Sequence, residues 1–390
     1  MRITICGPAN VSEFARHLPV SANIPEGMGG TAVNLLVHRL LELGHHVSLV
    51  TGSIGLDAPW HAAGLQLTVT VAPFRRKARS RALDLFRDER KHLRRAVLET
   101  HPDVVHAHWT YEFALAALDA GIAPTLVTAR DAPLTVLRLT PDPYRLFRSL
   151  LAYRTRPKIR HLTAVSPNLA RGWLQQMAYR RPIRVIPNPM PDLVIDRSLR
   201  STTPLVLAVG NDSRLKNCRT LLRAFPKVLA AHDDAQLRLI GPGLEPGGSM
   251  ARWARARNLH RSVTFVGSVN RTQLAQELSS ATIFCHPSLE ESFGNVLLEA
   301  LTARLPVVAG KRSGGVPWVL FDGRAGLLVD VRDPDKIAGG ITSAIRNPSS
   351  TVSKDFELET ELRNRYSIES VAEQYLDEYS RIIAIAREGK

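Results

Sequence analysis

The 390-residue chain has few cysteines and no long apolar run. Its three cysteines, Cys6, Cys218 and Cys285, lie far apart and outside any CxxC pair, which argues against a cysteine-based zinc site or a disulfide framework. No stretch approaches 18 consecutive apolar residues, so no segment is expected to span a bilayer. The opening MRITICGPAN lacks a basic region followed by a long apolar stretch. The sequence therefore predicts no signal peptide and a cytoplasmic protein.

The composition is that of a folded protein with an uneven charge. Hydrophobic residues make up 44% of the chain, which is enough to form buried cores and excludes wholesale disorder. The net charge is +15; residues 1–200 hold 27 basic and 15 acidic side chains, whereas residues 201–390 hold 24 and 21. This asymmetry predicts an anionic partner for the first half of the chain, namely a membrane surface, a phosphorylated acceptor or nucleic acid.

Short apolar segments alternate with helix-period segments along the chain. This alternation predicts an α/β protein whose parallel sheets are covered by helices on both faces. Thirteen strands are too many for one ordinary open sheet of this length, so two sheets are expected. The expected strands are Arg2–Cys6, His46–Val50, Leu67–Val71, Val104–Ala107, Thr125–Thr128, His161–Val165, Arg184–Ile186, Leu205–Val209, Gln236–Ile240, Val263–Phe265, Ile283–His286, Pro306–Ala309 and Gly326–Val329.

The domain boundary is expected near Pro187–Pro204, where IPNPMPD is rich in proline and SLRSTTP is polar. Residues 1–190 would then form one domain and residues 200–365 the other, since about 100 to 200 residues is an ordinary domain size. The closing segment Ile368–Ala386 has apolar residues at helical spacing.

Two loops between a strand and a helix have the composition of ligand-binding loops. Gly27, Gly29 and Gly30 precede the helix expected at Thr31–Leu43, and Lys216 follows the strand Leu205–Val209. In doubly wound sheets, ligands bind beyond the carboxyl ends of strands, where loops lead into helix N-termini. By themselves, these residues are better explained as a permissive turn and a solvated lysine than as a ligand-binding site.

The most informative loop follows the strand Ile283–His286. It reads PSLEESFGNVLLEA, with Glu291 and Glu299 eight positions apart and a helix expected to open at about Gly294. The amides of Gly294, Asn295 and Val296 would then lie at the positive end of that helix. The spacing of the two glutamates alone means little, because Glu361 and Glu369 share it.

The ordered set of sequence blocks resembles the family 4-type glycosyltransferases of the GT-B fold. EESFGNVLLEALTARLPVVAG is similar to the family's E-x7-E block, and RSGGVPWVLFDGRAGLLVD to the block after it. HPDVVHAHW, TAVSPNLA, VIPNP, LRLIGPG and VTFVGSV precede them in the chain and each resemble a family block, and all the blocks occur in the family's order. The resemblance implies two Rossmann-like doubly wound domains facing across a cleft. It also implies that RYSIESVAEQYLDEY crosses back, so that residues 366–390 pack on the first domain.

The resemblance also implies a role for each matching residue. Glu291 would contact the hydroxyls of the transferred sugar and Glu299 those of the ribose, Lys216 would neutralise the leaving diphosphate, and His108 would touch the sugar. Glu291, His108 and Lys216 are thus the catalytic candidates. The residues implied in binding the sugar donor are Gly30, Asn211, Arg214, Lys216, Gly294, Asn295, Val296 and Glu299.

Three positions depart from the family pattern. Asn211 stands where the family usually has an arginine, and Arg214 is the nearest cation that could replace it. Arg130 replaces the usual histidine of the VTxHD block, and Trp318 replaces the glutamate after GG-x-Pro. These changes leave the expected fold intact but place the identity of the sugar donor in question.

The implied reaction is transfer of a sugar from a nucleoside diphosphate to an acceptor hydroxyl, with the anomeric configuration retained. No metal or other cofactor is expected, because Lys216 and the helix N-terminus would stabilise the leaving diphosphate and no DxD-type motif stands in a suitable place. Two alternatives stay open: a catalytically impaired, sugar-nucleotide-binding homologue acting as a partner subunit, and an epimerase on the same fold.

Two basic stretches suggest where the anionic partner would bind. Residues 75–95 carry ten Lys or Arg and three acids, and residues 144–160 carry six basic residues and no acid, interleaved with apolar ones. This pattern is typical of an amphipathic surface helix on anionic lipid, and also of an ordinary solvated helix. We expect a lipid-linked, phosphorylated or other glycan acceptor at the cytosolic membrane face, and no nucleic acid. The expected patch comprises Arg75, Arg76, Lys77, Arg145, Arg148 and Arg154.

Overall fold

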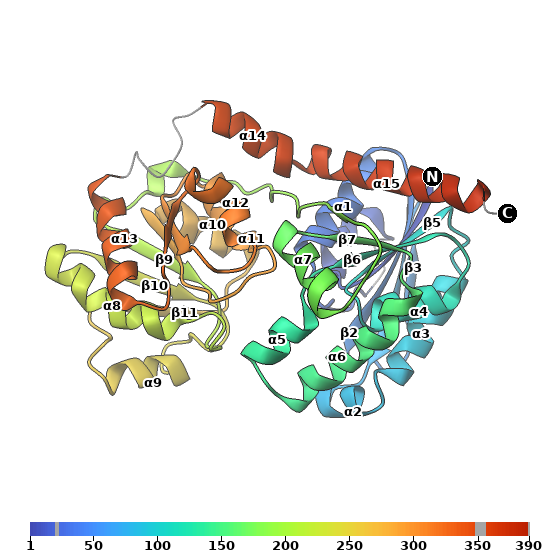
Figure 1. The fold of residues 1–390 in the computed structure, drawn as a ribbon, viewed down its shortest axis with the longest axis horizontal. Helices are drawn as coiled ribbons and strands as arrows, with labels where there is room; N and C mark the ends of the chain where they lie inside the picture. The colour runs from blue at the N-terminus through green and yellow to red at the C-terminus, as the bar shows by residue number, and fades with distance from the viewer. Residues whose placement is uncertain (20–22, 348–355, 389–390) are drawn as a thin grey trace. The chain divides into compact units, whose positions relative to one another are not determined.

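The computed structural model describes residues 1–19, 23–347 and 356–388, and the chain divides into two compact units (Figure 1). Unit 1 contains Met1–Pro189 and Arg365–Lys390, and unit 2 contains Met190–Asn364. Each unit has its own sheet and its own hydrophobic core. The chain passes from unit 1 to unit 2 between Pro189 and Met190, within the expected boundary at Pro187–Pro204.

Unit 1 is built on an eight-stranded sheet with the order β3-β4-β2-β1-β5-β6-β7-β8, parallel except for the β3–β4 pair. The strands are β1 (Arg2–Cys6), β2 (His46–Ile54), β3 (Trp60–Ala63), β4 (Leu67–Phe74), β5 (Val104–His108), β6 (Thr125–Ala129), β7 (His161–Ala164) and β8 (Ile183–Val185). The helices are η1 (Val11–His17), α1 (Thr31–Glu42), α2 (Ala78–Leu83), α3 (Arg87–Leu98), α4 (Glu112–Ala120), α5 (Pro133–Leu139), α6 (Pro143–Thr155), η2 (Arg156–Lys158), α7 (Pro167–Gln176) and α15 (Ile368–Glu388).

Unit 2 contains a six-stranded parallel sheet with the order β11-β10-β9-β12-β13-β14. Its strands are β9 (Leu205–Val209), β10 (Gln236–Ile240), β11 (Val263–Gly267), β12 (Ile283–His286), β13 (Val307–Gly310) and β14 (Leu327–Val329). The helices are η3 (Arg197–Leu199), α8 (Cys218–Ala231), α9 (Ser249–Arg255), α10 (Arg271–Ser280), α11 (Asn295–Thr302), α12 (Val316–Val319), η4 (Phe321–Gly323) and α13 (Pro334–Arg346); α14 (Phe356–Tyr366) ends at the division between the units.

All thirteen expected strands are present, with ends that differ by at most a few residues, and two parallel sheets form as predicted. The strand that the sequence did not predict is β3, which pairs antiparallel with β4 at the sheet edge. Its sequence WHAA has little β propensity, and only Ala62 is buried. Pairing with β4, rather than local preference, makes this segment a strand.

The C-terminal helix α15 belongs to the core of unit 1. It lies beside α1 (Figure 1), and Val371, Tyr375, Tyr379 and Ile382 are buried among residues of β1, β2, β4 and α1. The apolar residues at helical spacing therefore form the face of α15 that packs on the first domain, as the resemblance implied.

Candidate functional site

The carboxyl ends of β9 and β12 form the centre of the candidate site in unit 2. β9 lies between β10 and β12, so the chain winds outward from β9 in both directions and the flanking crossover helices lie on opposite faces. Ligands of such sheets bind at this point, and here the loops after β9 and β12 lie side by side, since the backbone N–H of Leu289 donates to the carbonyl of Leu215 at 2.8 Å. These are the two loops that carry Lys216 and Glu291.

Lys216, His286 and Glu291 meet at this edge. Lys216 Nζ lies 2.5 Å from Glu291 Oε1, and His286 Nε2 lies 3.2 Å from the same oxygen. His286 is 1% exposed, whereas the side chains of Glu291 and Lys216 are 13% and 25% exposed. The structure thus brings two of the three catalytic candidates into direct contact and adds His286, which the sequence analysis had treated only as part of a strand.

Glu291 is held as a carboxylate. Burial alone would raise its pKa, but the contacts with His286 and the positive charge of Lys216 outweigh burial and hold the pKa far below its usual range. A charged carboxylate is a strong acceptor for sugar hydroxyls. Lys216 is in turn paired with this carboxylate.

Helix α11 begins directly after this carboxylate. Its N-cap is Gly294, with φ +92°, and no side chain caps the end. Asn295 and Val296 form the first turn, where backbone amides have no partner within the helix. This end of α11 is therefore suited to an anionic group of a ligand.

Glu299 lies one turn further along α11. Burial raises the pKa of its carboxyl, and the positive charge of Arg271 opposes this effect in part. The two glutamates of the E-x7-E block thus have opposite pKa shifts. Glu291 has a cation in contact, whereas in the part of the chain that the structure describes Glu299 forms no ion pair.

Two residues that the sequence analysis did not single out fix the loops of the site. Asn217, in the left-handed conformation with φ +56°, donates from Nδ2 to the carbonyls of Pro287 at 3.0 Å and Val331 at 2.8 Å. A Cβ on Gly314 would lie 2.3 Å from the carbonyl oxygen of Glu291, so only glycine fits there. In the sequence, an asparagine before a helix and a pair of glycines after a strand are the features that could have identified Asn217 and Gly314.

The structure does not place Asn211 or Arg214 in contact with Lys216 or Glu291. The Oδ1 atom of Asn211 accepts from the backbone N–H of Ser213 at 3.0 Å, so this side chain stabilises its own loop. Arg214 is exposed and lines a pocket of about 420 Å³ with Arg219 and Arg223. Whether Arg214 replaces the family's phosphate-binding arginine stays a prediction.

Gly30 and His108 lie at the corresponding edge of the unit 1 sheet. Gly30 is the N-cap of α1 with φ +110°, and a Cβ there would lie 2.1 Å from the carbonyl oxygen of Pro8. This close approach requires glycine. His108 is the last residue of β5 and is fully buried.

His108 belongs to a buried polar network. Arg130, which follows β6, donates from Nη2 to His108 Nδ1 at 2.9 Å and from Nη1 to Asn188 Oδ1. The neighbouring His106 contacts the Tyr379 hydroxyl through Nδ1 and Thr128 Oγ1 through Nε2, both at 2.7 Å. His106 therefore anchors α15 to the sheet.

We expect this network to make stability depend on pH. Burial, followed by the charges of neighbouring groups, lowers the pKa values of His106 and His108 well below the ordinary value. Both stay neutral in the folded chain while the unfolded chain takes up protons below about pH 6.5. The free energy of unfolding should therefore fall as pH drops from 7.5 to 5.5, by up to about 1.4 kcal/mol per pH unit for each histidine.

Urea denaturation at several pH values measures this slope. The groups facing the pair are Arg130, Tyr375 and Tyr379, none of which changes charge in this range. A His106→Gln variant should show a shallower slope than the unaltered chain, whereas His260→Gln, at an exposed position, should not. Equal slopes in both variants would contradict the assignment.

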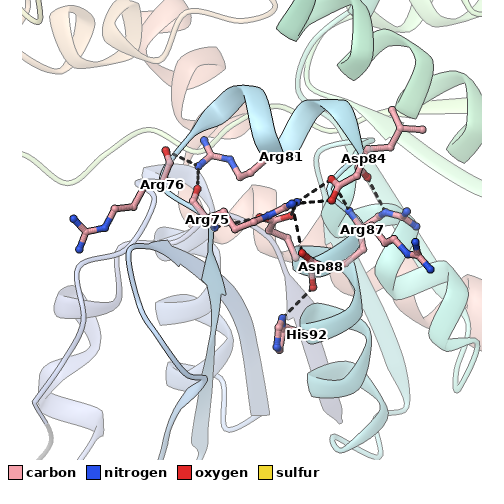
Figure 2. Close-up of polar contacts among 10 residues, drawn as sticks. Arg75, Arg76, Arg81, Asp84, Arg87, Asp88 and His92 are labelled. Atoms are coloured by element: carbon pink, nitrogen blue, oxygen red, sulfur yellow. Dashed lines mark hydrogen bonds and ion pairs between the residues drawn. The ribbon is translucent and has the colours of Figure 1, made fainter.

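The structure corrects two members of the basic patch. The Arg75 guanidinium contacts Asp84, Asp88 and the fully buried Glu89, with its Nη1 atom 2.7 Å from Asp84 Oδ2 (Figure 2). Arg148 is 14% exposed, lies 3.5 Å from Glu112 and stacks 3.9 Å above the Tyr111 ring. Arg75 and Arg148 each face a buried carboxylate within unit 1, which offsets the positive charge that they would present to a membrane or an acceptor.

The other four patch residues have different surroundings. Arg145 pairs with Asp142, the N-cap residue of its own helix. Arg76, Lys77 and Arg154 are exposed and form no ion pair in the part of the chain that the structure describes. The positively charged surface that remains is smaller than the sequence suggested.

Two family models match successive parts of the chain. Residues 29–192 match the model described as Glycosyltransferase Family 4, and residues 194–366 match the model described as Glycosyl transferases group 1. Together they follow the division into units 1 and 2 closely.

Curated relatives include inositol-phosphate and phosphatidylinositol glycosyltransferases. A D-inositol 3-phosphate glycosyltransferase from Corynebacterium kroppenstedtii is 33% identical over 50% of this chain and 46% of its own length. A phosphatidyl-myo-inositol mannosyltransferase from Mycobacterium leprae is 32% identical over 65% of this chain and 67% of its own. The chain thus spans slightly less than half of the first of these relatives.

Solved structures show the same fold at low sequence identity. The sucrose-phosphate synthase from Thermosynechococcus elongatus has a TM-score of 0.76 at 19% identity and covers 99% of this chain and 100% of its own. Anabaena HepE in complex with UDP-glucose has a TM-score of 0.68 at 16% identity, with coverage of 98% and 100%. Two Rossmann-like units, the ordered family blocks and these matches together show that the chain belongs to the family 4-type glycosyltransferases of the GT-B fold.

Proposed function

We propose that the chain is a retaining glycosyltransferase that moves a sugar from a nucleoside-diphosphate sugar to an acceptor hydroxyl. The observation that carries this proposal is the contact between Lys216 and Glu291 beside the N-terminus of α11, at the point where the strand order of unit 2 reverses. A cation, a charged carboxylate and the positive end of a helix are the groups needed to hold a diphosphate on one side and sugar hydroxyls on the other.

Charge development on the leaving diphosphate is the main electrostatic demand of such a transfer. Lys216 can supply a full positive charge and the α11 N-terminus a partial one. Because Glu291 holds Lys216 in the ligand-free structure, an arriving diphosphate would draw Nζ away and leave the carboxylate free for sugar hydroxyls. The proposal includes no metal ion, so transfer should persist after treatment with EDTA.

A thermal-shift screen tests the binding step. UDP-, GDP-, ADP- and dTDP-sugars are compared with their free sugars at equal concentration, because a bound ligand stabilises the folded chain by mass action. One base should raise the melting temperature, and Lys216→Met should remove that shift. If none of the sugar nucleotides stabilises the chain, the proposal fails. Anabaena HepE, solved with UDP-glucose, makes UDP-glucose the first to test.

A catalytically impaired homologue is the competing proposal. Arg214 is exposed, and Asn211 binds a backbone N–H of its own loop. Neither residue contacts Glu291, so Lys216 is the cation that does, which favours an impaired homologue. Release of nucleoside diphosphate from the bound sugar nucleotide in the absence of acceptor distinguishes the two. Slow hydrolysis that Glu291→Gln reduces supports the transferase, whereas tight binding without hydrolysis supports the impaired homologue.

We propose a phosphorylated or lipid-linked acceptor at a membrane surface. The relatives act, by their names, on inositol 3-phosphate and phosphatidyl-myo-inositol. Helix α6 carries Leu146, Leu150 and Tyr153 at spacings of four and three, and they are 47%, 49% and 37% exposed. The exposed Arg154 follows them, and α2 packs beside α6 (Figure 1). An apolar stripe with adjacent cations suits an anionic bilayer surface.

Vesicle flotation tests this surface. No helix in the described ranges is both long and apolar enough to cross a bilayer, so attachment would be peripheral. The full chain should bind vesicles containing anionic lipid, and binding should weaken as salt rises. Replacing Leu146, Leu150 and Arg154 by serine should abolish flotation, whereas Arg255→Ser with Arg261→Ser, at exposed positions in unit 2, should not. Equal flotation of both variants would refute the proposal.

A further inference from the structure

Helix α8 presents two arginines beside a pocket at its N-terminal end. Arg219 and Arg223 lie one turn apart on this helix and are exposed, and together with Arg214 they line a pocket of about 420 Å³. A pocket of this volume can hold a small-molecule ligand. Neither Lys216 nor Glu291 is among its lining residues. The pocket is therefore distinct from the candidate site for the sugar nucleotide.

Trp253 on α9 orders the two arginines of α8. Helix α8 packs beside α9 (Figure 1), and the guanidinium carbons of Arg219 and Arg223 lie 5.2 and 5.4 Å from the centroid of the Trp253 ring. The guanidinium carbon of Arg257 lies 4.8 Å from the same centroid. Contact with an aromatic ring restricts the conformations of an arginine side chain. Arg219 and Arg223 therefore lose less conformational freedom when they bind a ligand.

The arginines of this pocket have no counter-ion. Within residues 1–19, 23–347 and 356–388, none of Arg214, Arg219 and Arg223 forms an ion pair. Asp212 also lines the pocket, and its Oδ2 atom accepts from Ser249 Oγ at 2.9 Å. Three arginines and one aspartate give the lining a net charge of +2. Like charges one helical turn apart repel each other, so an anion in the pocket would relieve this repulsion.

The neutral polar side chains of the lining are used within the protein. Asn217 Nδ2 donates to the carbonyls of Pro287 and Val331, and Thr220 Oγ1 donates to Asn217 Oδ1 at 2.6 Å. The guanidinium groups are thus the main donors that the pocket offers to a ligand, and they cannot accept a hydrogen bond. Such a lining favours an anion with several acceptor oxygens.

We infer that this pocket binds the phosphate group of a phosphomonoester. At pH 7 such a group carries a charge of about −1.5 to −2 and three acceptor oxygens. This charge matches the net charge of the lining, and the oxygens match the forked donors of Arg219 and Arg223. The phosphodiester of a lipid headgroup carries less negative charge and fits less well. The ligand is an additional one, beyond the sugar nucleotide and the acceptor of the proposed transfer.

Calorimetric titration of the full chain tests the inference with three probes that share a glycerol group. They are glycerol 3-phosphate, a water-soluble short-chain phosphatidylglycerol and uncharged glycerol. Glycerol 3-phosphate should bind most tightly, and glycerol should not bind. Binding should weaken as salt rises, because the lining arginines are exposed. The Lys216→Met variant should bind glycerol 3-phosphate as tightly as the unaltered chain, because Lys216 does not line the pocket.

Arg219→Gln combined with Arg223→Gln should weaken binding of glycerol 3-phosphate by about 10- to 100-fold, the range expected when charge-assisted hydrogen bonds are lost. The matched control is Arg255→Gln combined with Arg261→Gln. It removes the same charge from exposed positions of unit 2 that do not line this pocket, and it should bind as tightly as the unaltered chain. Because all four positions are exposed, both variants should unfold at the same urea concentration as the unaltered chain, which shows that they are folded.

Four results would overturn the inference. They are binding of none of the three probes, binding of phosphatidylglycerol or glycerol at least as tight as that of glycerol 3-phosphate, equal affinities in the two double variants, and loss of binding in Lys216→Met. The last would assign the phosphate to the sugar-nucleotide site instead. Each can occur while the unaltered chain binds and hydrolyses a sugar nucleotide, in which case the proposed function stands. If no sugar nucleotide stabilises the chain while phosphate binding still depends on Arg219 and Arg223, the proposed function fails and this site remains.

Discussion

Lys216→Met is expected to slow sugar transfer by about 100- to 1,000-fold, the loss typical when a group that stabilises developing charge is removed. The KM for the sugar nucleotide should rise, because Lys216 would contact the diphosphate already in the bound state, and kcat should fall, because the diphosphate gains negative charge as it leaves. Lys216 Nζ lies 2.5 Å from Glu291 Oε1, so the same change also leaves Glu291 without its cation. Steady-state kinetics with the sugar nucleotide found in the thermal-shift screen measure both constants.

Glu291→Gln serves as the partner variant for Lys216→Met. It should slow transfer by about 10- to 100-fold, because a neutral amide binds hydroxyls less strongly than a carboxylate. Since the two side chains contact each other, the double variant should be about as slow as Lys216→Met alone. Lys336→Met, at an exposed position in the same unit, is the matched control. Multiplicative effects in the double variant would show that the two residues act separately.

Arg148→Met is expected to lower the free energy of unfolding by about 3–5 kcal/mol, the usual cost of leaving one charge of a buried pair alone. Glu112 is 1% exposed, and Arg148 Nη1 lies 3.5 Å from its Oε1 atom. The negative charge of Glu112 acts against burial and holds the pKa of Arg148 above its ordinary value. Without Arg148, the buried carboxylate of Glu112 would be left without the cation that faces it. Urea denaturation at pH 7.5 measures the change.

A second substitution separates charge from packing. Arg148→Met combined with Glu112→Gln should recover much of the lost stability, because both charges of the pair are then removed. Arg154→Met, on the same helix but exposed, should change stability little. If the double variant is as unstable as Arg148→Met, the loss comes from the stacking of Arg148 on Tyr111, and the charge argument fails.

The sequence alone was sufficient for the strands, because they are short, apolar and separated by turn-forming residues. Buried parallel strands have this pattern whatever their neighbours. β3 was not predicted, because its sequence WHAA lacks this apolar pattern. It becomes a strand by pairing with β4. The helical spacing of Ile368–Ala386 likewise identified a buried face, and the structure identified α1 as its neighbour.

Among the candidate site residues, the sequence identified those that a motif marks. Glu291, Glu299 and Lys216 stand in recognisable blocks, and the reversal of strand order at β9 places their loops at one edge. The contact between Lys216 and Glu291 joins residues 75 positions apart. No local pattern encodes such a contact, which depends on how two loops end side by side.

The basic residues show what composition cannot decide. By sequence, Arg75, Arg148 and Arg154 are equivalent members of cation-rich stretches, yet Arg75 and Arg148 neutralise buried carboxylates while Arg154 is exposed. By sequence, Arg130 is a departure from a family pattern, and only the fold shows that it contacts His108 and Asn188. The sequence determined the strands, the family and the motif glutamates, because these are local or repeated patterns. Tertiary structure decided the state of each charge, because a charge is set by the groups that surround it in space.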